Sequence, residues 1–523
     1  MSSIDSGLPL SDQASAMALT RQQLRGSGLL LAGRVLSMSV NLIVQILIVR
    51  YLSTRDFGAL VYALTVVYVL CNFATLGLRN GLARFVPLYA ERGDTPRLWG
   101  LLLIIVGGTL AASFVLIAVV HTFPAAIGSA FGHSHQSLDL LLILVLLAPL
   151  ETLDALAIEF FASMSRARAI FFRRDFLASV FKLCVVLGVI ALQADVRTLA
   201  WCSVAATALG LGINGVMLVR LLRRSRLQHR KSARIVLPFR ELFAFTLPLV
   251  TTDLMLLTVH AAGILMLGYF YDTTRVALYR AVLPLANLNS AIMASFAVLY
   301  LPLAARFLAQ RDKAALNLLY WKAAAWVAVL SFPLFAITCG LAGPLIGLFY
   351  GERYESSAMV LTLMAIAMYF NVALGFNGLT LRLLGRARYV MTIDLFTMLL
   401  VIGLDLFLVP RYGPLGAAIG AATAIVVHNV LAQVALSRAS VGGFELRLHR
   451  LYAGLAVLAS IVVAINWFAS DNLLVTMPTV LICSLLAVVL SKNALQVEGI
   501  FPELARIPLV GGLLRCRAAR ESA

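Results

Sequence analysis

Long apolar runs recur along the whole chain, and they restrict its fold more than any other feature. The hydrocarbon core of a bilayer is about 30 Å thick, and roughly 20 apolar residues in a helix cross it. Fourteen such runs lie at 28–50, 57–78, 99–120, 138–163, 175–193, 198–219, 242–269, 276–304, 323–349, 357–380, 389–410, 414–437, 452–470 and 473–491. The sequence therefore predicts an all-α polytopic membrane protein with about 14 transmembrane helices.

The composition also points to a membrane protein. Hydrophobic residues make up 61% of the 523 residues and charged residues 13%, whereas a soluble domain has about half and about a quarter. The 42 Lys and Arg exceed the 24 Asp and Glu by 18. In so apolar a chain this excess favours membrane lipids or an anionic lipid-linked substrate as partner, and we expect no nucleic acid.

The basic residues predict how the chain is inserted. The N-terminus, every second connection and the C-terminus together hold 33 of the 42 Lys and Arg. The other connections hold six, and Arg34, Lys182 and Arg280 fall inside apolar runs. Because Lys and Arg are retained on the cytoplasmic side, both ends of the chain are expected in the cytoplasm.

An internal repeat relates the two halves. The triplet Arg166-Ala-Arg168 recurs 220 residues later as Arg386-Ala-Arg388, and Thr54-Arg55 recurs at the same offset as Thr274-Arg275. This offset maps the first predicted helix onto the seventh, so both halves have the same orientation in the membrane. The repeat predicts two pseudo-symmetric six-helix lobes, two appended helices and a substrate cavity between the lobes near the midplane.

These patterns divide the chain into six parts. The expected parts are a cytoplasmic tail at 1–27, an N-terminal lobe at 28–219, a basic cytoplasmic linker at 220–241, a C-terminal lobe at 242–437, two further helices within 452–491 and a cytoplasmic tail at 492–523.

Charged residues inside the apolar runs are the candidates for substrate binding, because an ionisable group at bilayer depth needs a partner, water or a function. Arg34 and Asp253 occupy nearly equivalent positions in the two halves. Arg34 can bind a phosphate while Asp253 holds or releases it, or the two can form a structural ion pair. Arg280 can line the cavity or reach the headgroups, and Lys182 can line the cavity or pair with Asp175.

Acidic residues form a second group of candidates. Glu151, Asp154 and Glu159 lie within about half of the circumference of the fourth predicted helix. They can relay protons as an ion-coupling site, or they can pair with Lys182 and other bases. Asp394 and Asp405 of the eleventh helix leave the same two alternatives open.

Three further features have less specific interpretations. Arg79, Arg84, Arg92 and Arg97 can guide an anionic headgroup or simply contact lipid phosphates. Gly416 and Gly420 predict close helix packing within the bundle. His121, His133 and His135 belong to one outer connection, but His-x-His without a third close ligand is a poor metal site, so we expect none, and no motif indicates a cofactor.

Several stretches resemble the polysaccharide biosynthesis flippases, the Wzx-type branch of the multidrug/oligosaccharidyl-lipid/polysaccharide exporter superfamily. The resemblance spans essentially the whole chain. The stretches that show it most clearly lie at 50–62, 76–78, 84–94, 246–249, 383–386 and 412–417.

The resemblance implies a multi-pass protein of the bacterial inner membrane that works by alternating access. Its implied function is to move polyprenyl-diphosphate-linked oligosaccharide units from the cytoplasmic to the outer leaflet for exopolysaccharide, capsule or O-antigen (lipopolysaccharide) synthesis. Polysaccharide polymerase machinery is an implied partner. Related flippases line their cavity with arginines, and Arg34 and Arg280 occupy suitable helices.

Two other functions fit the sequence less well. A cation-coupled multidrug exporter of the same superfamily usually has twelve helices, and its cationic drugs favour carboxylates in the cavity. A membrane enzyme such as a polymerase needs a long outer loop, whereas the longest outer connection here is about 18 residues, between the third and fourth runs. We therefore expect a transporter and no enzyme.

Overall fold

Helices are the only regular secondary structure in the described part of the chain. The computed structural model describes residues 33–75, 77–124, 135–164, 167–224, 235–439, 441, 443, 448–469 and 472–495. The expected tail at 1–27, His133, the side chain of His135, and much of the linker at 220–241 and of the tail at 492–523 lie outside these residues. The all-α fold class predicted from the sequence is confirmed.

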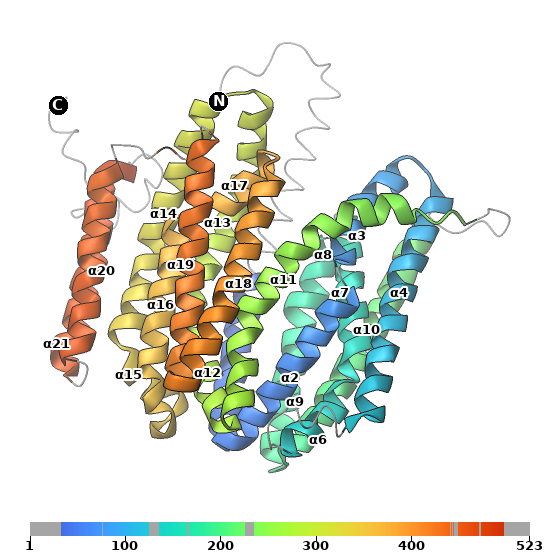
Figure 1. Cartoon of the computed structure of the whole chain (residues 1–523), viewed down its shortest axis with the longest axis horizontal. Coiled ribbons are helices and arrows are strands. Elements are labelled where there is room, and N and C mark those ends of the chain that lie inside the picture. The colour runs from blue at the N-terminus through green and yellow to red at the C-terminus, as the bar shows by residue number, and fades with distance from the viewer. Residues whose placement is uncertain are drawn as a thin grey trace. The chain divides into compact units, whose positions relative to one another are not determined.

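The helices of the first half begin with an unlabelled one at Gly33–Tyr51. The elements that follow are α2 (Thr54–Thr75), α3 (Leu78–Glu91), α4 (Thr95–Thr122), α6 (His135–Leu144), α7 (Leu147–Ser163), α8 (Ala167–Ile170), the π-helix η1 (Phe171–Leu177), α9 (Ala178–Ala191) and α10 (Val196–Arg224). The α-helices among them are labelled in Figure 1.

The second half is helical as well. Its elements are α11 (Phe239–Phe270), α12 (Thr273–Ala286), α13 (Leu288–Ala309), α14 (Lys313–Gly340), α15 (Ala342–Tyr350), the 3-10 helix η2 (Glu352–Ser357), α16 (Ala358–Ala373), α17 (Asn377–Leu383), α18 (Ala387–Tyr412), α19 (Pro414–Arg438), α20 (His449–Ala469) and α21 (Leu473–Leu495).

Twelve of the described helices are long and apolar enough to cross a membrane. A thirteenth crossing is obtained if Gln136–Leu144 and Leu147–Ser163, which meet at 45°, form one span. The predicted run at 175–193 is not among them, because the π-helix η1 interrupts the α-helix there. The count from length and composition is thus lower than the predicted fourteen.

The chain forms two compact units. The first contains residues 1–47, 70–122 and 142–247, and the second contains 48–69, 123–141 and 248–523. Three long helices, Gly33–Tyr51, α2 and α11, therefore pass from one unit to the other, and α11 does so at Pro248.

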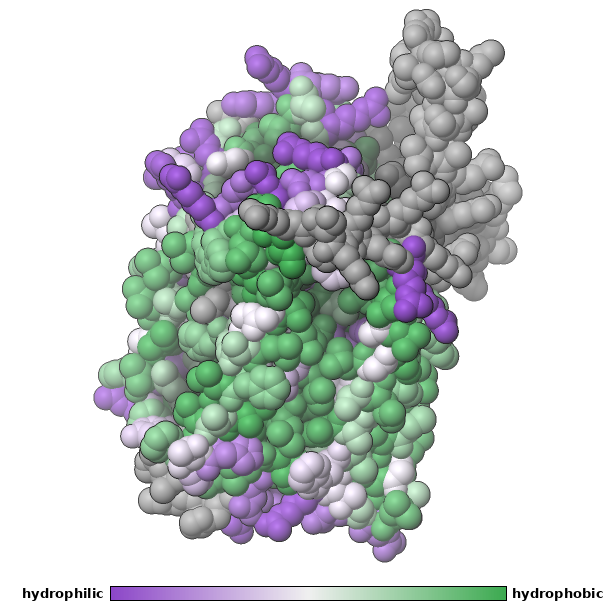
Figure 2. All heavy atoms as spheres, turned by 90° about the vertical axis from the view of Figure 1, so that its right-hand side faces the viewer, coloured by the Kyte–Doolittle hydropathy of each residue, from purple (hydrophilic) through white to green (hydrophobic). Residues whose placement is uncertain are grey.

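The first unit has its core between α3, α4 and α7. Leu82 and Phe85 of α3, Leu101 of α4 and Leu156 of α7 are buried together. The face displayed in Figure 2 has an apolar belt between two hydrophilic ends. Such a belt is what a polytopic protein presents to lipid.

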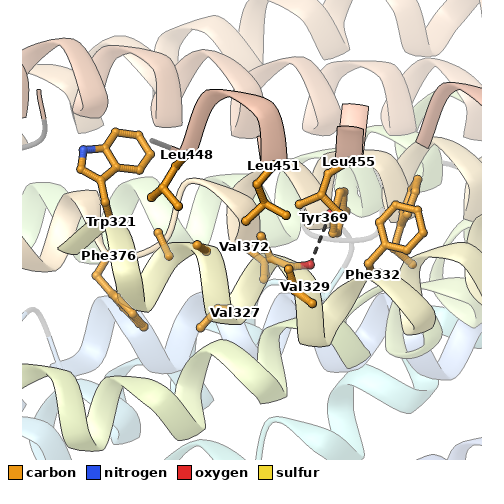
Figure 3. Packing of buried hydrophobic residues seen from close by; sticks show 14 of the residues in the cluster. Trp321, Val327, Val329, Phe332, Tyr369, Val372, Phe376, Leu448, Leu451 and Leu455 are labelled. Carbon is orange, nitrogen blue, oxygen red and sulfur yellow. Dashed lines mark hydrogen bonds between the residues drawn. The ribbon is translucent and has the colours of Figure 1, made fainter. Parts of the chain in front are cut away.

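The second unit is built around α14. Phe332 and Phe335 of α14 pack against Tyr369 of α16, and the Tyr369 hydroxyl donates to the carbonyl of Ala328 at 3.3 Å. Figure 3 shows the leucines of α20, including Leu451, covering this cluster. Aromatic rings bury more area than aliphatic side chains and pack in defined orientations, so they fix the helices of this core.

Small residues allow α18 and α19 to approach closely. A Cβ atom at Gly416 would lie 2.3 Å from the carbonyl oxygen of Leu408, and one at Gly420 would lie 2.1 Å from Oδ1 of Asp405. The prediction that this glycine pair serves packing within the bundle is confirmed.

Two arginines cap the C-termini of two neighbouring helices in the second unit, Gly33–Tyr51 and α15. Arg50, at the end of the first described helix, donates from Nε to the carbonyl of Phe349 at 2.9 Å and also contacts the carbonyl of Leu348. Arg353 donates to the carbonyls of Val49 at 2.6 Å and Arg50 at 2.7 Å. Both therefore satisfy the unpaired carbonyls at a helix C-terminus.

A carboxylate caps the N-terminus of α10. Asp195 accepts hydrogen bonds from the backbone N–H and the hydroxyl of Thr198, at 2.9 and 2.7 Å. These bonds hold the pKa of Asp195 below its usual value, because they stabilise the charged form.

Candidate functional site

A buried ion pair lies inside the first unit. Nη2 of Arg173 donates to Oδ1 of Asp154 at 2.5 Å, and the side chains are 4% and 17% exposed. The same oxygen accepts from Nδ2 of Asn214 at 2.7 Å, and Nε of Arg173 donates to the carbonyl of Gly210 at 3.1 Å. Only glycine fits there, since a Cβ at Gly210 would lie 2.2 Å from the guanidinium.

The π-helix η1 places this arginine. Residues 171–177 are wound with i to i+5 hydrogen bonds, a form that is rare and frequent at functional sites. Arg173 and Asp175 are both buried, although they are separated by only one residue. Both charged side chains are therefore enclosed by the protein, and Arg173 is held between α7 and α10.

A second acid–base pair lies in the same segment. Nε of Arg174 is 3.0 Å from Oδ1 of Asp175, and the arginine side chain is 47% exposed. Asp175 lies against the first described helix, where a Cβ at Gly33 would be 2.9 Å from its Oδ2. Pairing with Asp175 was one of the two alternatives for Lys182, and the ion-pair partner of Asp175 in the structure is Arg174.

The other predicted residues of this unit are more accessible. Arg34, Glu151 and Lys182 are exposed, and Glu159 is half-buried. Glu151 interacts electrostatically with Lys182 and with Asp154. Charges of both signs therefore follow α7, η1 and α9. Exposure of such charges to the lipid core would be costly, whereas exposure to a water-filled cavity would not.

The arginines around α3 differ in their contacts. Arg84 stacks on the ring of Phe245 at 4.2 Å, and Arg97 lies 3.4 Å from Asp94 and 3.7 Å from Glu241. Arg79 and Arg92 are exposed. Only the latter two present cations that no described residue engages.

The second unit has its own buried carboxylate on α18. Asp394 accepts a hydrogen bond from the hydroxyl of Thr252 at 2.6 Å, and its other oxygen lies 3.8 Å from Nδ1 of His428. Asp253 follows Thr252 on α11 and is half-buried. Arg34 lies in the first unit and Asp253 in the second. The prediction that the two side chains face each other therefore stays a prediction.

Arg280 lies among tyrosines. It is half-buried on α12 and interacts electrostatically with Tyr279 and Tyr350. Asp405 is 1% exposed, and neither of its oxygens has a hydrogen-bond partner among the described residues. Gly420 makes room for this carboxylate.

A cavity of about 260 Å³ lies within the second unit. It is lined by Met255, Leu256, Val259, His260, Tyr279, Leu283, Asn287, Ser290, Met364, Met368, Asn371, Thr397, Ala421, Ala424, Ile425, His428 and Asn429. Thirteen of these residues fall in the middle of the spans 249–270, 352–383, 387–412 and 414–438, and the other four, Tyr279, Leu283, Asn287 and Ser290, lie around the junction of α12 and α13. The cavity is therefore at mid-depth of the spanning helices.

A break in a helix opens onto this cavity. The helices α12 and α13 together cover the predicted run at 276–304 but are separated at Asn287, three residues after Pro284. Asn287 and Ser290 line the cavity on either side of the start of α13. Discontinuous helices at mid-depth are typical of transporter binding sites.

An amide network forms another wall. Nδ2 of Asn377 donates to Oδ1 of Asn429 at 3.1 Å, and Nδ2 of Asn429 donates to Oδ1 of Asn371 at 2.9 Å. The side chains come from α17, α19 and α16. Their hydrogen bonds fix Asn371 at the edge of the cavity.

The sequence did not reveal two of these features. Arg173 was counted with the cytoplasmic loop because it precedes an apolar run, whereas the helix already starts at Ala167. The asparagines of the cavity have no periodicity or spacing that would distinguish them. The break at Asn287 had one signal, Pro284 within an apolar run.

Solved structures place this fold in a class. The lipid II flippase MurJ, in an inward closed conformation, matches with a TM-score of 0.69 and 16% identity over 91% of this chain and 100% of its own. The MATE multidrug transporter DinF-BH matches with a TM-score of 0.59 and 14% identity over 80% of this chain and 95% of its own. A multidrug resistance MATE family transporter of the MOP superfamily, in an inward-facing conformation, matches with a TM-score of 0.58 and 12% identity over 77% of this chain and 95% of its own. The chain thus has the fold of the MOP-superfamily alternating-access transporters.

The sequence also identifies the family. The profile described as "Polysaccharide biosynthesis protein" matches residues 47–359, which is more than half of the chain. The protein belongs to this family, and the resemblance found in its sequence is confirmed. No curated protein matches its sequence.

Proposed function

We propose that the protein is a flippase that moves polyprenyl-diphosphate-linked oligosaccharide units from the cytoplasmic to the outer leaflet of the bacterial inner membrane. The family and the transporter fold support a membrane transporter in polysaccharide biosynthesis. Its termini face the cytoplasm in this proposal. The observation that favours an anionic lipid is the exposed Arg34, a cation within a spanning helix that has no ion-pair partner among the described residues.

The chemistry of the substrate explains why an unpaired arginine is useful. A diphosphate has several acceptor oxygens, and a guanidinium binds two of them in parallel. The oligosaccharide needs no covalent change to cross the membrane. The glycan serves exopolysaccharide, capsule or O-antigen synthesis in this proposal, and polysaccharide polymerase machinery would receive it.

Arg34→Ala is expected to reduce the appearance of lipid-linked glycan in the outer leaflet at least about tenfold, because a charge-assisted bidentate contact is lost. The measurement is the accessibility of the glycan to a membrane-impermeant label in cells. Arg220→Ala, at an exposed arginine near the end of α10, is the matched control. Unchanged export by a normally inserted Arg34→Ala protein would exclude this arginine from the mechanism.

Proton coupling gives a second prediction, on Glu151. In vesicles with an imposed pH gradient, Glu151→Gln is expected to lose the acceleration of transport that the gradient gives to the unmodified protein, because glutamine cannot release a proton. Glu355→Gln, at an exposed residue of η2, is expected to keep it. Equal flux in the Glu151→Gln and unmodified proteins would rule out a carboxylate relay through this residue.

A further inference from the structure

The chemical character of the cavity in the second unit differs from that of the charged clusters. Among the residues that line it there is no Lys, Arg, Asp or Glu. Its polar groups are amides, hydroxyls and imidazoles. A diphosphate would find no cation here, and an organic cation would find no carboxylate in the wall.

The hydrogen-bonding groups of the cavity are of both kinds. His260 uses Nδ1 to donate to the carbonyl of Leu256 at 2.7 Å, which leaves Nε2 as an acceptor. Asn371 accepts with Oδ1 from Asn429, which leaves its amino group as a donor. Thr397 donates to the carbonyl of Ile393 at 2.8 Å, so its oxygen remains an acceptor. A ligand that suits this wall must itself both donate and accept.

The rest of the lining is apolar and adaptable. Met255, Met364 and Met368 contribute thioether chains, and Tyr279 contributes an aromatic ring. Such side chains adapt to irregular shapes and pack against C–H groups. The volume of about 260 Å³ lies just below the range of small-molecule pockets, roughly 300–1,000 Å³, so the cavity suits a single small ring better than a whole oligosaccharide.

We propose that this cavity binds a neutral sugar residue of the transported lipid. A pyranose has hydroxyl groups that donate and accept around its rim and C–H groups on its faces, and it has no charge. An acyl or prenyl chain would leave the amides unpaired, which is costly at this depth. The inference rests on the proposed function and adds to it a site for the glycan, separate in chemistry from Arg34, which is assigned to the diphosphate.

The test compares two lipids on the full-length protein in nanodiscs. One is polyprenyl diphosphate, and the other is the same lipid carrying glucose, galactose or N-acetylglucosamine. The unmodified protein is expected to bind at least one of the sugar-bearing lipids about tenfold more tightly than the bare lipid, the gain of one to three hydrogen bonds.

Ser290→Leu fills the cavity from α13 and removes a hydroxyl. It is expected to remove the tenfold preference while leaving the affinity for bare polyprenyl diphosphate unchanged. Ser295→Leu is the matched control, because Ser295 lies on the same helix and is half-buried but does not line the cavity. Asn371→Ala, which removes a donor without adding bulk, is expected to reduce the preference about threefold.

The outcomes separate this inference from the proposed function. If the unmodified protein binds neither lipid, the proposed function fails and the inference fails with it. If it binds both lipids equally, or if Ser290→Leu weakens both or neither, the sugar site is wrong while the diphosphate-lipid substrate stands. Loss of the preference in Ser290→Leu and Asn371→Ala alone, with unchanged melting temperatures, supports the sugar site.

Discussion

Arg173→Ala is expected to lower the free energy of unfolding by about 3–5 kcal/mol, because it leaves the carboxylate of Asp154 buried without its cation. The loss of stability arises from the Asp154 carboxylate, which remains buried after the arginine is removed. Oδ1 of Asp154 would keep only the hydrogen bond from Asn214, and the space beside Gly210 would be empty. Thermal unfolding of the purified protein in detergent, followed by size-exclusion chromatography after heating, measures the change.

A double variant separates the buried charge from loss of packing. Arg173→Met with Asp154→Asn removes both charges, fills the volume and keeps an acceptor for Asn214. It is expected to recover most of the stability lost by Arg173→Ala, as replacing a whole buried pair costs little. If the double variant were as unstable as Arg173→Ala, the ion pair would not be the cause. Arg220→Ala, at an exposed site, is expected to change the unfolding free energy by less than about 1 kcal/mol.

The sequence predicted the helical fold because the signals for it are local. An apolar run of about 20 residues is read directly from the chain, and a pair such as Gly416 and Gly420 marks close packing wherever it occurs. Their structural counterparts are the spans and the tight contact of α18 with α19. Neither inference needs any knowledge of which distant helices meet.

The candidate sites were predicted only in part, for a physical reason. Asp154 was recognised because a carboxylate in an apolar run stands out, but its partner Arg173 was not, because η1 extends the helix into a stretch that appears as a basic loop. The cavity depends on Asn287, Asn371 and Asn429, which are far apart in sequence. Neutral amides are too common outside binding sites to mark one until the fold brings them together.

Gly58→Ala is expected to destabilise the protein by about 3 kcal/mol, although it adds a single methyl group. A Cβ at Gly58 would lie 1.7 Å from the backbone carbonyl oxygen of Thr273, at the start of α12. A side chain could move aside, but this carbonyl belongs to the first turn of a helix, so α2 must separate from α12. One turn further along α2, Tyr62 packs onto Gly268 just as closely, with a hypothetical Cβ 2.1 Å from its ring, and the separation would disturb this contact too.

Gly188→Ala is the matched control for Gly58→Ala, and the stability of both variants is measured by thermal unfolding. Gly188 lies in α9, and a Cβ there would have no neighbour within 4 Å. Alanine favours a helix over glycine by up to about 1 kcal/mol, so this variant is expected to be as stable as the unmodified protein or slightly more stable. If Gly58→Ala melted at the same temperature as Gly188→Ala, α2 and α12 would not meet at Gly58. Because α2 continues from the second unit into the first after Val69, a loosened α2 is also expected to reduce transport, whereas Gly188→Ala should leave it unchanged.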